Sequence, residues 1–209
     1  MSLLAGATAA QTWPAKPVRV VVGFTAGGTT DVLARNVGQQ LGDKFKQPFV
    51  VDNKPGAGGN LGTEIAIRAP ADGYTLLVAS VGPIAVNPTL YPKLGHNPQA
   101  DLVPIVLLAD VPNVLVVHPS VPANTLEEFV AYARANPGKL NYCSTGIGTS
   151  SHLSGFLLAK RAGLAGDARA VQRRRCAERP AQRPHPVHVR DHPVGAPAHR
   201  RRRRCARWR

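Results

Sequence analysis

Several features that mark common functional classes are missing from the sequence. Its three cysteines show no Cys-x-x-Cys spacing, so they predict neither a disulfide framework nor a zinc site. No apolar run approaches the roughly 20 residues that a membrane-spanning helix needs. A GxxxxGK[ST] phosphate loop and a GxSxG nucleophile elbow are absent, and the best GxGxxG pattern fails at Leu61. We therefore expect a protein that is not an enzyme and that uses no metal or cofactor.

The positive charge is concentrated at one end of the chain. Of the net charge of +14, residues 165–209 contribute +11 through 14 arginines and three acids. After Leu164 the chain has no Leu, Ile, Phe, Met, Tyr, Ser, Thr, Asn or Lys. A segment without large aliphatic side chains has little to bury against its ordering entropy. We therefore expect a disordered Arg/Pro-rich tail from residue 165 onward.

The chain begins with a small, apolar segment. Residues 1–10 contain Ala7-x-Ala9 and resemble the end of a secretory signal. The basic part and most of the apolar part of such a signal are missing, so we expect a signal-peptide remnant whose true start lies upstream. A floppy Ala-rich terminus is the alternative interpretation.

Between these two ends, short β-type runs alternate with helical patterns. This alternation predicts an α/β fold with a mostly parallel sheet. The first helix is expected to open at Asp31 and to end at Gly42, and a capping-box sequence starts a later helix at Thr125. The predicted strands are 18–24, 49–52, 75–79 and 140–143, and two further apolar runs occur at 105–108 and 114–117.

Two loops are candidates for ligand binding because each joins a strand to the start of a helix. The amides of a first helical turn lack intrahelical partners, and the helix dipole there favours an anion. Loop 24–31 has two glycines that permit close backbone approach, and loop 144–152 has five hydroxyl side chains and two glycines. Neither loop contains Lys or Arg. Amides and hydroxyls would hold the anion, which suits a carboxylate better than a polyphosphate.

Several features of these loops have more than one interpretation. Asp31 can cap its own helix or contact a ligand amine. His152 can donate to a ligand or satisfy local backbone groups, and Cys143 is most simply a small buried strand residue. For each loop taken alone, a glycine-rich turn before a capped helix is the alternative to a binding site.

Four longer motifs occur in order around these loops. They are FTAGGTTDVLAR at 24–35, NKPGAGGNLG at 53–62, ADGYTL at 71–76 and NYCSTGIGTSSHL at 141–153. Together they resemble the Bug family, the periplasmic substrate-binding components of tripartite tricarboxylate transporters. The resemblance covers Trp13 to about Leu164.

The resemblance implies a fold, a function and a set of site residues. The fold is an incomplete bilobed periplasmic-binding-protein fold (type II, Venus-flytrap), with the N-terminal part of a first lobe at 13–100 and part of a second lobe at 101–164. The implied function is that of a monomeric periplasmic receptor. It would capture a small di- or tricarboxylate, or an amino-acid-like ligand, for the permease subunits of a membrane transporter. The residues carried over are Phe24, Gly27, Gly28, Thr29 and Asp31 on one wall, and Ser144, Thr145, Gly148, Thr149, Ser150 and His152 on the other.

The tail departs from the family pattern, since family members continue in their own sequence where this chain becomes Arg-rich. A reading frame shifted by one nucleotide permits Met/Thr-His-Val-Pro-Tyr across 167–172. Across 184–196 it permits His-Ile-Gln-Phe-Met-Phe-Glu-Thr-Ile-Pro-Ser-Ala. Both strings resemble what the family carries next. We therefore hypothesise a one-nucleotide frameshift, or a sequencing slip, between about residues 164 and 167. A chain truncated in this way is expected to have no measurable carboxylate affinity.

Two other functions stay open at this point. The tail, with Arg200–Arg204 and Trp208, could bind nucleic acid through charge and stacking. Under the frameshift hypothesis these arginines follow from GC-rich codons, and no specific nucleic-acid partner is expected. The effector domain of a cytoplasmic regulator is a third candidate. The Ala7-x-Ala9 remnant and the lack of a helix-turn-helix argue against it.

Overall fold

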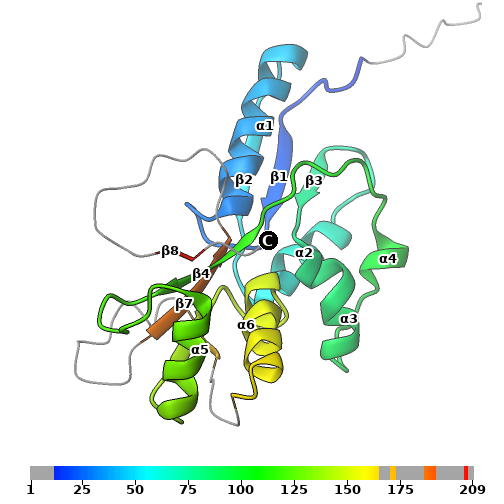
Figure 1. Cartoon of the computed structure of the whole chain (residues 1–209). Coiled ribbons are helices and arrows are strands. Elements are labelled where there is room, and N and C mark those ends of the chain that lie inside the picture. The colour runs from blue at the N-terminus through cyan, green and yellow to red at the C-terminus, as the bar shows by residue number, and fades with distance from the viewer. Residues whose placement is uncertain (1–11, 165–169, 173–185, 192–204, 207–209) are drawn as a thin grey trace, which may run out of the picture.

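The structure, a computed structural model, describes residues 12–164 in full and the backbone of 170–172, 186–191 and 205–206. These residues form two α/β units, each built on one sheet, and Figure 1 shows the first sheet above the second. Among the described residues, no helix has the length and apolar character that crossing a membrane requires. The expected signal remnant at 1–10 lies outside the described residues.

The first unit contains a three-stranded parallel sheet in the order β2-β1-β3. Its central strand carries a β-branched run in which Val18, Val21 and Val22 are fully buried, as is typical of a parallel strand covered on both faces. The strands are β1 (Val18–Val22), β2 (Phe49–Asn53) and β3 (Thr75–Val78). The helices are α1 (Thr29–Phe45), η1 (Ala57–Gly59), α2 (Asn60–Ile67), η2 (Gly82–Val86), α3 (Asn87–Leu90) and α4 (Pro98–Asp101).

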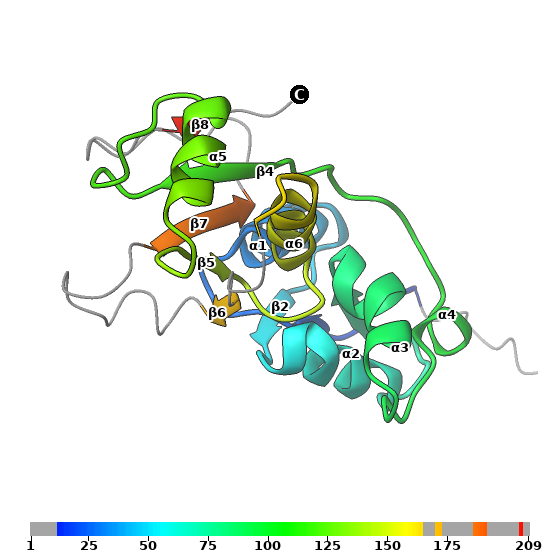
Figure 2. The same cartoon turned by 60° about the horizontal axis from the view of Figure 1, so that its bottom comes forward.

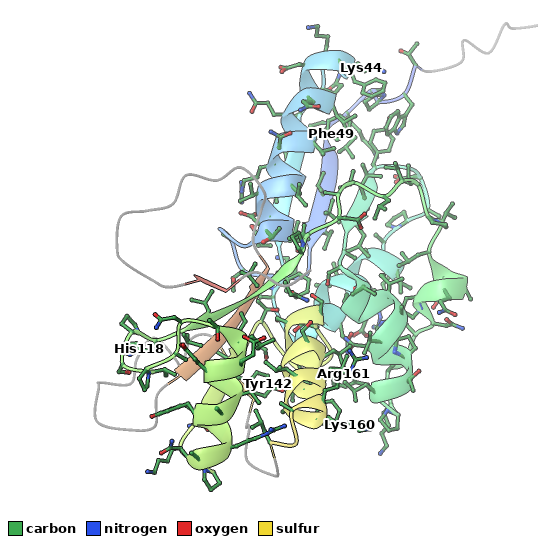
Figure 3. All side chains as sticks on the ribbon, in the orientation of Figure 1. Lys44, Phe49, His118, Tyr142, Lys160 and Arg161 are labelled. Atoms are coloured by element: carbon green, nitrogen blue, oxygen red, sulfur yellow. The ribbon has the colours of Figure 1, made fainter. Side chains whose placement is uncertain are left out.

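Helix α1 runs past Gly42, so the prediction that this glycine ends the helix is wrong. The helix continues to Phe45, and the amide of Lys46 then donates to the Gly42 carbonyl. The Phe45 ring packs edge-on against Trp13, with 5.4 Å between centroids, and lies 6.2 Å from Phe49. We attribute the longer helix to these aromatic contacts, which outweigh the cost of about 1 kcal/mol for an interior glycine. Figure 3 shows Phe49 at the end of the first unit that lies away from the second sheet.

The second unit has a five-stranded sheet in the order β6-β5-β7-β4-β8. Strand β5 runs parallel to β6 and β7, whereas β4 runs antiparallel to β7 and β8, so this sheet is mixed rather than mostly parallel. Figure 2 shows β7 between β4 and β5. The elements are β4 (Asn113–Val117), α5 (Leu126–Ala135), β5 (Asn141–Ser144), α6 (Ser150–Arg161), β6 (Ala170–Gln172), β7 (Pro186–Asp191) and β8 (Cys205–Ala206).

Three of these strands, β6, β7 and β8, are short segments of the tail at 165–209, which was expected to be disordered. Strands β6 and β7 pair with the two sides of β5, and β7 and β8 pair with the two sides of β4. A strand edge is completed by main-chain N–H and C=O groups, which nearly every residue carries whatever its side chain. Composition alone therefore does not prevent pairing. The rest of the tail lies outside the described residues.

The capping box predicted at Thr125 is confirmed. The Thr125 hydroxyl accepts from the Glu128 amide, and the Glu128 carboxylate accepts from the Thr125 amide. The helix that follows buries Phe129 against Leu115 and Tyr142 in the core of the second unit. The cap thus fixes the start of α5 where its apolar face meets the sheet.

The segment at 102–112 connects the two units and has no helix or strand. It contains the apolar run predicted from the sequence, but Val103, Ile105, Val106 and Leu107 are 70–88% exposed. Such a row of exposed aliphatic side chains is uncommon on a folded surface.

Candidate functional site

The two loops singled out from the sequence lie at the junction of the two units. Loop 24–31 leads into α1 from the end of β1, and loop 144–152 leads into α6 from the end of β5. In Figure 1, α1 begins at its lower end and α6 at its upper end. The starts of both helices therefore face the region between the two sheets.

The first loop is shaped by two glycines and leaves the start of α1 without a side-chain cap. Gly27 has φ 77°, a left-handed conformation that favours glycine. Gly28 is the N-cap residue, is extended, and carries no side chain that could accept from the first turn. The half-buried ring of Phe24 lies against Gly59, where an added Cβ would stand 3.0 Å from the ring. Thr29 is the first residue of the helix and is partly exposed.

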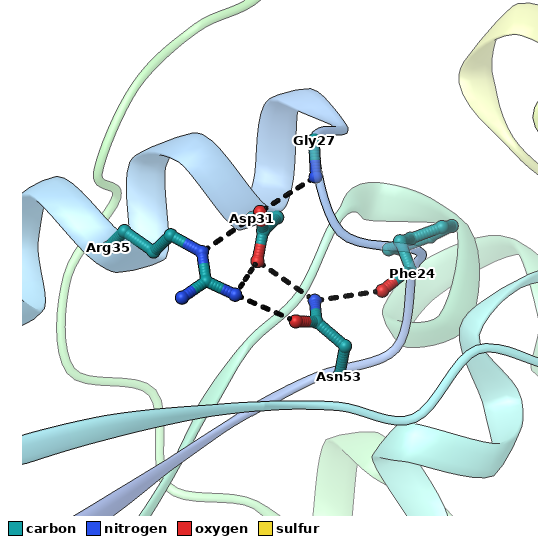
Figure 4. A network of polar contacts seen from close by, with 5 residues as sticks. All are labelled: Phe24, Gly27, Asp31, Arg35 and Asn53. Atoms are coloured by element: carbon teal, nitrogen blue, oxygen red, sulfur yellow. Dashed lines mark hydrogen bonds and ion pairs between the residues drawn. The ribbon is translucent and has the colours of Figure 1, made fainter.

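Asp31 is buried and is held entirely by groups of its own unit (Figure 4). Its carboxylate accepts from the Gly27 amide at 2.8 Å and from the Asn53 side chain at 2.9 Å. The Arg35 guanidinium donates to it at 3.1 Å through Nε. Asn53 also donates to the Phe24 carbonyl at 3.1 Å. The network ties both ends of the loop to strand β2. Asp31 lies in the first turn of α1, whose N-cap residue is Gly28, so the interpretation of Asp31 as the cap of its own helix is wrong.

The same contacts set the charge of Asp31. Burial by itself raises the pKa of the carboxyl, but the hydrogen bonds from Arg35, Gly27 and Asn53 outweigh burial, so the pKa lies below its ordinary value. Asp31 is therefore ionised at neutral pH and paired with Arg35. Its negative charge is compensated locally, which leaves the start of α1 suitable for an anion.

The second loop is held by a cluster of hydroxyl groups. Ser151 is fully buried, and its oxygen accepts from the Thr145 amide at 3.2 Å. The Thr145 and Thr149 hydroxyls lie 3.0 Å and 3.2 Å from the same oxygen. The Thr149 hydroxyl also donates to the Gly146 carbonyl at 2.6 Å. These hydroxyls shape the loop, and α6 begins after Thr149 without a side-chain cap.

The other predicted residues of this wall differ in exposure. Ser144 is buried at the end of β5, Gly148 is buried with φ 84°, and Ser150 is partly exposed in the first turn of α6. Thr145 is exposed. Cys143, beside them, is buried and disulfide-bonded, which the interpretation as a plain buried residue did not include.

His152 takes part in local contacts. Its ring stacks on Tyr142 with 6.2 Å between centroids, and Nδ1 lies 3.4 Å from the Gly148 amide. Burial lowers the pKa of His152 and raises that of Tyr142. A neutral imidazole that accepts from a backbone amide fits the interpretation that His152 satisfies local backbone groups.

Three asparagines shape the junction and were not among the predicted residues. Asn53 holds Asp31, while Asn60 and Asn87 are buried at the starts of α2 and α3 and bond to each other. The signal in the sequence was the position of each residue at the end of a strand or the start of a helix. An amide side chain in such a place has many roles, so the sequence alone could not distinguish them.

The site offers main-chain amides and few charges. Neither loop contains Lys or Arg, and Arg35 is engaged by Asp31. The part of the chain that the structure describes holds no group of three His, Cys, Asp or Glu side chains arranged for a metal ion. Two uncapped helix starts facing one region suit a small anion with two negatively charged ends.

Comparisons with known proteins agree on one family. Residues 33–168 match the family described as "Tripartite tricarboxylate transporter family receptor". The protein BugT of Bordetella pertussis is 39% identical over 163 residues, which is 78% of this chain and 50% of that protein. The chain thus spans about half the length of the curated relatives it matches.

Solved structures with the same fold include two that contain a carboxylate. R. palustris Rpa4515 with adipate is 34% identical, with a TM-score of 0.78 over 86% of this chain and 60% of that one. MatC from Rhodopseudomonas palustris with bound malate is 32% identical, with a TM-score of 0.70 over 77% of this chain and 54% of that one. The expected periplasmic-binding-protein fold is therefore confirmed for the part of the chain that these structures cover. With the family match extending over more than half of its residues, the chain belongs to the tripartite tricarboxylate transporter family of receptors.

Proposed function

We propose that this chain derives from a periplasmic receptor that captures a small carboxylate, as a monomer and without catalysis, for the permease subunits of a tripartite transporter. The observation that carries the proposal is the pair of uncapped helix starts, α1 after Gly28 and α6 after Thr149, which face the same region between the sheets. The amides of each start can donate to one carboxylate group.

The chemistry of the two loops supports a dicarboxylate as the ligand class. A polyphosphate would need cationic side chains, and neither loop contains one. Two relatives of known structure are described with adipate and with malate, and both of these ligands are dicarboxylates. The chain covers only 54–60% of those two proteins. The remainder of each would supply further walls of the cleft.

Calorimetry tests this function. The ligands are adipate, malate and the neutral diamide of adipate, titrated into the 209-residue chain and into a chain whose reading frame is restored after residue 164. We expect one-to-one binding of a dicarboxylate, and none of the diamide, by the restored chain. The 209-residue chain should give no measurable heat. Equal binding of the diamide, or no binding of any carboxylate by the restored chain, would refute the proposal.

We propose in addition that the tail is the second half of this receptor read in a frame shifted by one nucleotide. The positions of the tail strands support this. Strand β6 lies within the segment whose shifted reading permits His-Val-Pro-Tyr, and over 187–191 in β7 the shifted reading permits Phe-Met-Phe-Glu-Thr. The central strand of the second sheet thus coincides with a segment for which the shifted frame permits an apolar strand sequence.

The connecting segment also supports the frame proposal. The exposed side chains of Val103, Ile105, Val106 and Leu107 are those that further elements of a longer chain would cover. The nucleotide sequence in the shifted frame decides the matter. We expect an open frame that continues the family resemblance. Stop codons or unrelated sequence after residue 164 would eliminate the idea.

The tail as a nucleic-acid-binding segment has less support. Arg200–Arg204 and Trp208 lie outside the described residues, and the names of the matched relatives do not mention nucleic acid. The comparisons favour the receptor.

A further inference from the structure

A buried asparagine stands where the second candidate loop meets the first unit. Asn87 begins α3, and its side chain is fully buried. Its Nδ2 donates to Oδ1 of Asn60, at the start of α2, so the two amides join the starts of two helices of the first unit. This anchors one side of the Asn87 side chain within its own unit.

The other side of Asn87 faces the second unit. A Cβ added to Gly148 would stand 2.0 Å from Oδ1 of Asn87 and 3.3 Å from the Leu90 side chain. Because Gly148 also has φ 84°, the position excludes any larger residue on two grounds. The Asn87 amide therefore fills the space that a side chain at 148 would need.

Two more glycines bring the main chains of the units together at this point. A Cβ on Gly58 would lie 2.4 Å from the Ile147 carbonyl oxygen, and one on Gly82 would lie 3.0 Å from the Gly148 carbonyl oxygen. The loop at 144–149 thus rests directly on backbone of the first unit. Asn87 is the polar side chain enclosed by this contact.

Oδ1 of Asn87 is buried and has no hydrogen-bond partner among the described residues. Folded proteins rarely keep a buried carbonyl oxygen in this state, and where they do the group usually has a specific role. It lies 2.0 Å from where a Cβ of Gly148 would stand, and Gly148 is next to the N-cap residue of α6.

We propose that Asn87 is a positioning residue that fixes loop 144–149 against the first unit and so sets the distance between the two walls of the site. The role of Asn87 in setting the distance between the walls of the site rests on the proposed function. The contact itself is tested without any ligand, so its failure and the failure of carboxylate binding are separate results.

A double-mutant cycle on the full chain tests the contact. The variants are Asn87→Ala, Gly148→Ala and both together, and the measurement is amide hydrogen exchange of residues 144–152 by mass spectrometry. We expect each single change to speed exchange in this loop on the order of tenfold, equivalent to about 1.4 kcal/mol. The double variant should be no faster than the faster single variant, because Asn87→Ala makes room for the new methyl group. The backbone strain of an alanine at position 148 is the same with and without the Asn87→Ala change, so it cancels in the cycle.

Thr63→Val is the matched control. Thr63 is as buried as Asn87 and belongs to the same unit, and its hydroxyl donates to the Gly59 carbonyl at 3.1 Å. It should lower overall stability without selectively speeding exchange at 144–152. If Asn87→Ala yields no folded protein, Asn87→Ser takes its place. Additive effects of the two single changes, or an equal local effect of Thr63→Val, would overturn the proposal.

Discussion

Arg35 lies one turn of α1 after Asp31, with Nη2 3.0 Å from one carboxylate oxygen and Nε 3.1 Å from the other. More than half of the Arg35 side chain is exposed, whereas Asp31 is buried. The carboxylate is thus closed off from solvent by its partner and held from inside the loop by Gly27. A charge in this arrangement holds the loop in place.

Replacing Asp31 with Asn is expected to reduce the free energy of unfolding at pH 7 by about 1–3 kcal/mol, since several donors lose an ionised acceptor. The pKa of Asp31 is lowered in the folded state. The carboxylate therefore stabilises the fold above its ordinary pKa, and the contribution is lost as pH falls through the lowered folded value. The difference between wild type and variant in urea unfolding should be constant from pH 7 to about pH 5 and shrink below the ordinary value of 3.8. Asp43→Asn, at an exposed acid of the same helix, should change stability by less than about 0.5 kcal/mol. A difference that grows with acidification would contradict the expected sign.

Replacing Ser151 with Ala should destabilise the second candidate loop by about 1–3 kcal/mol, because the Thr145 amide loses its acceptor inside the protein. Ser154→Ala is the control on the same helix, since the Ser154 oxygen accepts one bond, from Asn113 at 2.9 Å. Chemical denaturation compares the two. A loss for Ser151→Ala no larger than that for Ser154→Ala would mean that the hydroxyl cluster does not hold the loop.

Substitution by alanine should lower the stability of the protein at one helical glycine but not at another. A Cβ on Gly155 in α6 would stand 2.6 Å from the buried Tyr142 ring, so Gly155→Ala is expected to cost about 1–3 kcal/mol. A Cβ on Gly38 in α1 would meet only ordinary contacts, 3.4 Å from the Phe49 carbonyl oxygen. Gly38→Ala should therefore be neutral or stabilise by up to about 1 kcal/mol. Thermal unfolding of the two variants measures the contrast, and a stabilising Gly155→Ala would show that Tyr142 can move aside.

The exposed side chain of Ile105 gives a test that depends on the reading frame. In the 209-residue chain Ile105 is 77% exposed, so Ile105→Lys should alter unfolding free energy by less than about 0.5 kcal/mol. If the restored second half covers this segment, the same change there buries an unpaired charge and should cost several kcal/mol. Equal tolerance in both chains would mean that the restored half does not cover residues 103–107.

Much of the fold could be predicted from the sequence because local pattern and final environment agree. The valine run of β1 predicts a parallel strand covered on both faces, and the structure has such a strand there. The capping box at Thr125 depends only on two residues that are three positions apart in the sequence. The end of α1 could not be predicted, because the contacts of Phe45 with Trp13 and Phe49 join residues distant in the sequence. The mixed second sheet was missed for a related reason, since its central strand β7 comes from a segment whose composition offers no strand signal.

The candidate site could also be predicted only in part. The glycines and hydroxyls of the two loops are visible as dense motifs, and their places at helix starts follow from the strand-helix order. The partners of Asp31 are less visible, because Asn53 approaches from a neighbouring strand. Asn87 was missed because its importance comes from Gly148, which is 61 positions further along the chain.

Because of its aromatic contacts, Trp13 should report by its fluorescence on the folding of the first unit but not on ligand binding at the start of α1. Its ring lies against Phe45, at the last residue of α1, and a helix of 17 residues places that end about 25 Å from the loop that begins the helix. The chain has two tryptophans, so Trp208→Phe leaves Trp13 as the single emitter. In the 209-residue chain its fluorescence should follow the melting of the first unit. In the chain with the restored frame, the Trp13 fluorescence should stay constant when a small anion arrives at the far end of α1. A signal that responds to a carboxylate would mean that the whole first unit, and not only its loops, rearranges on binding.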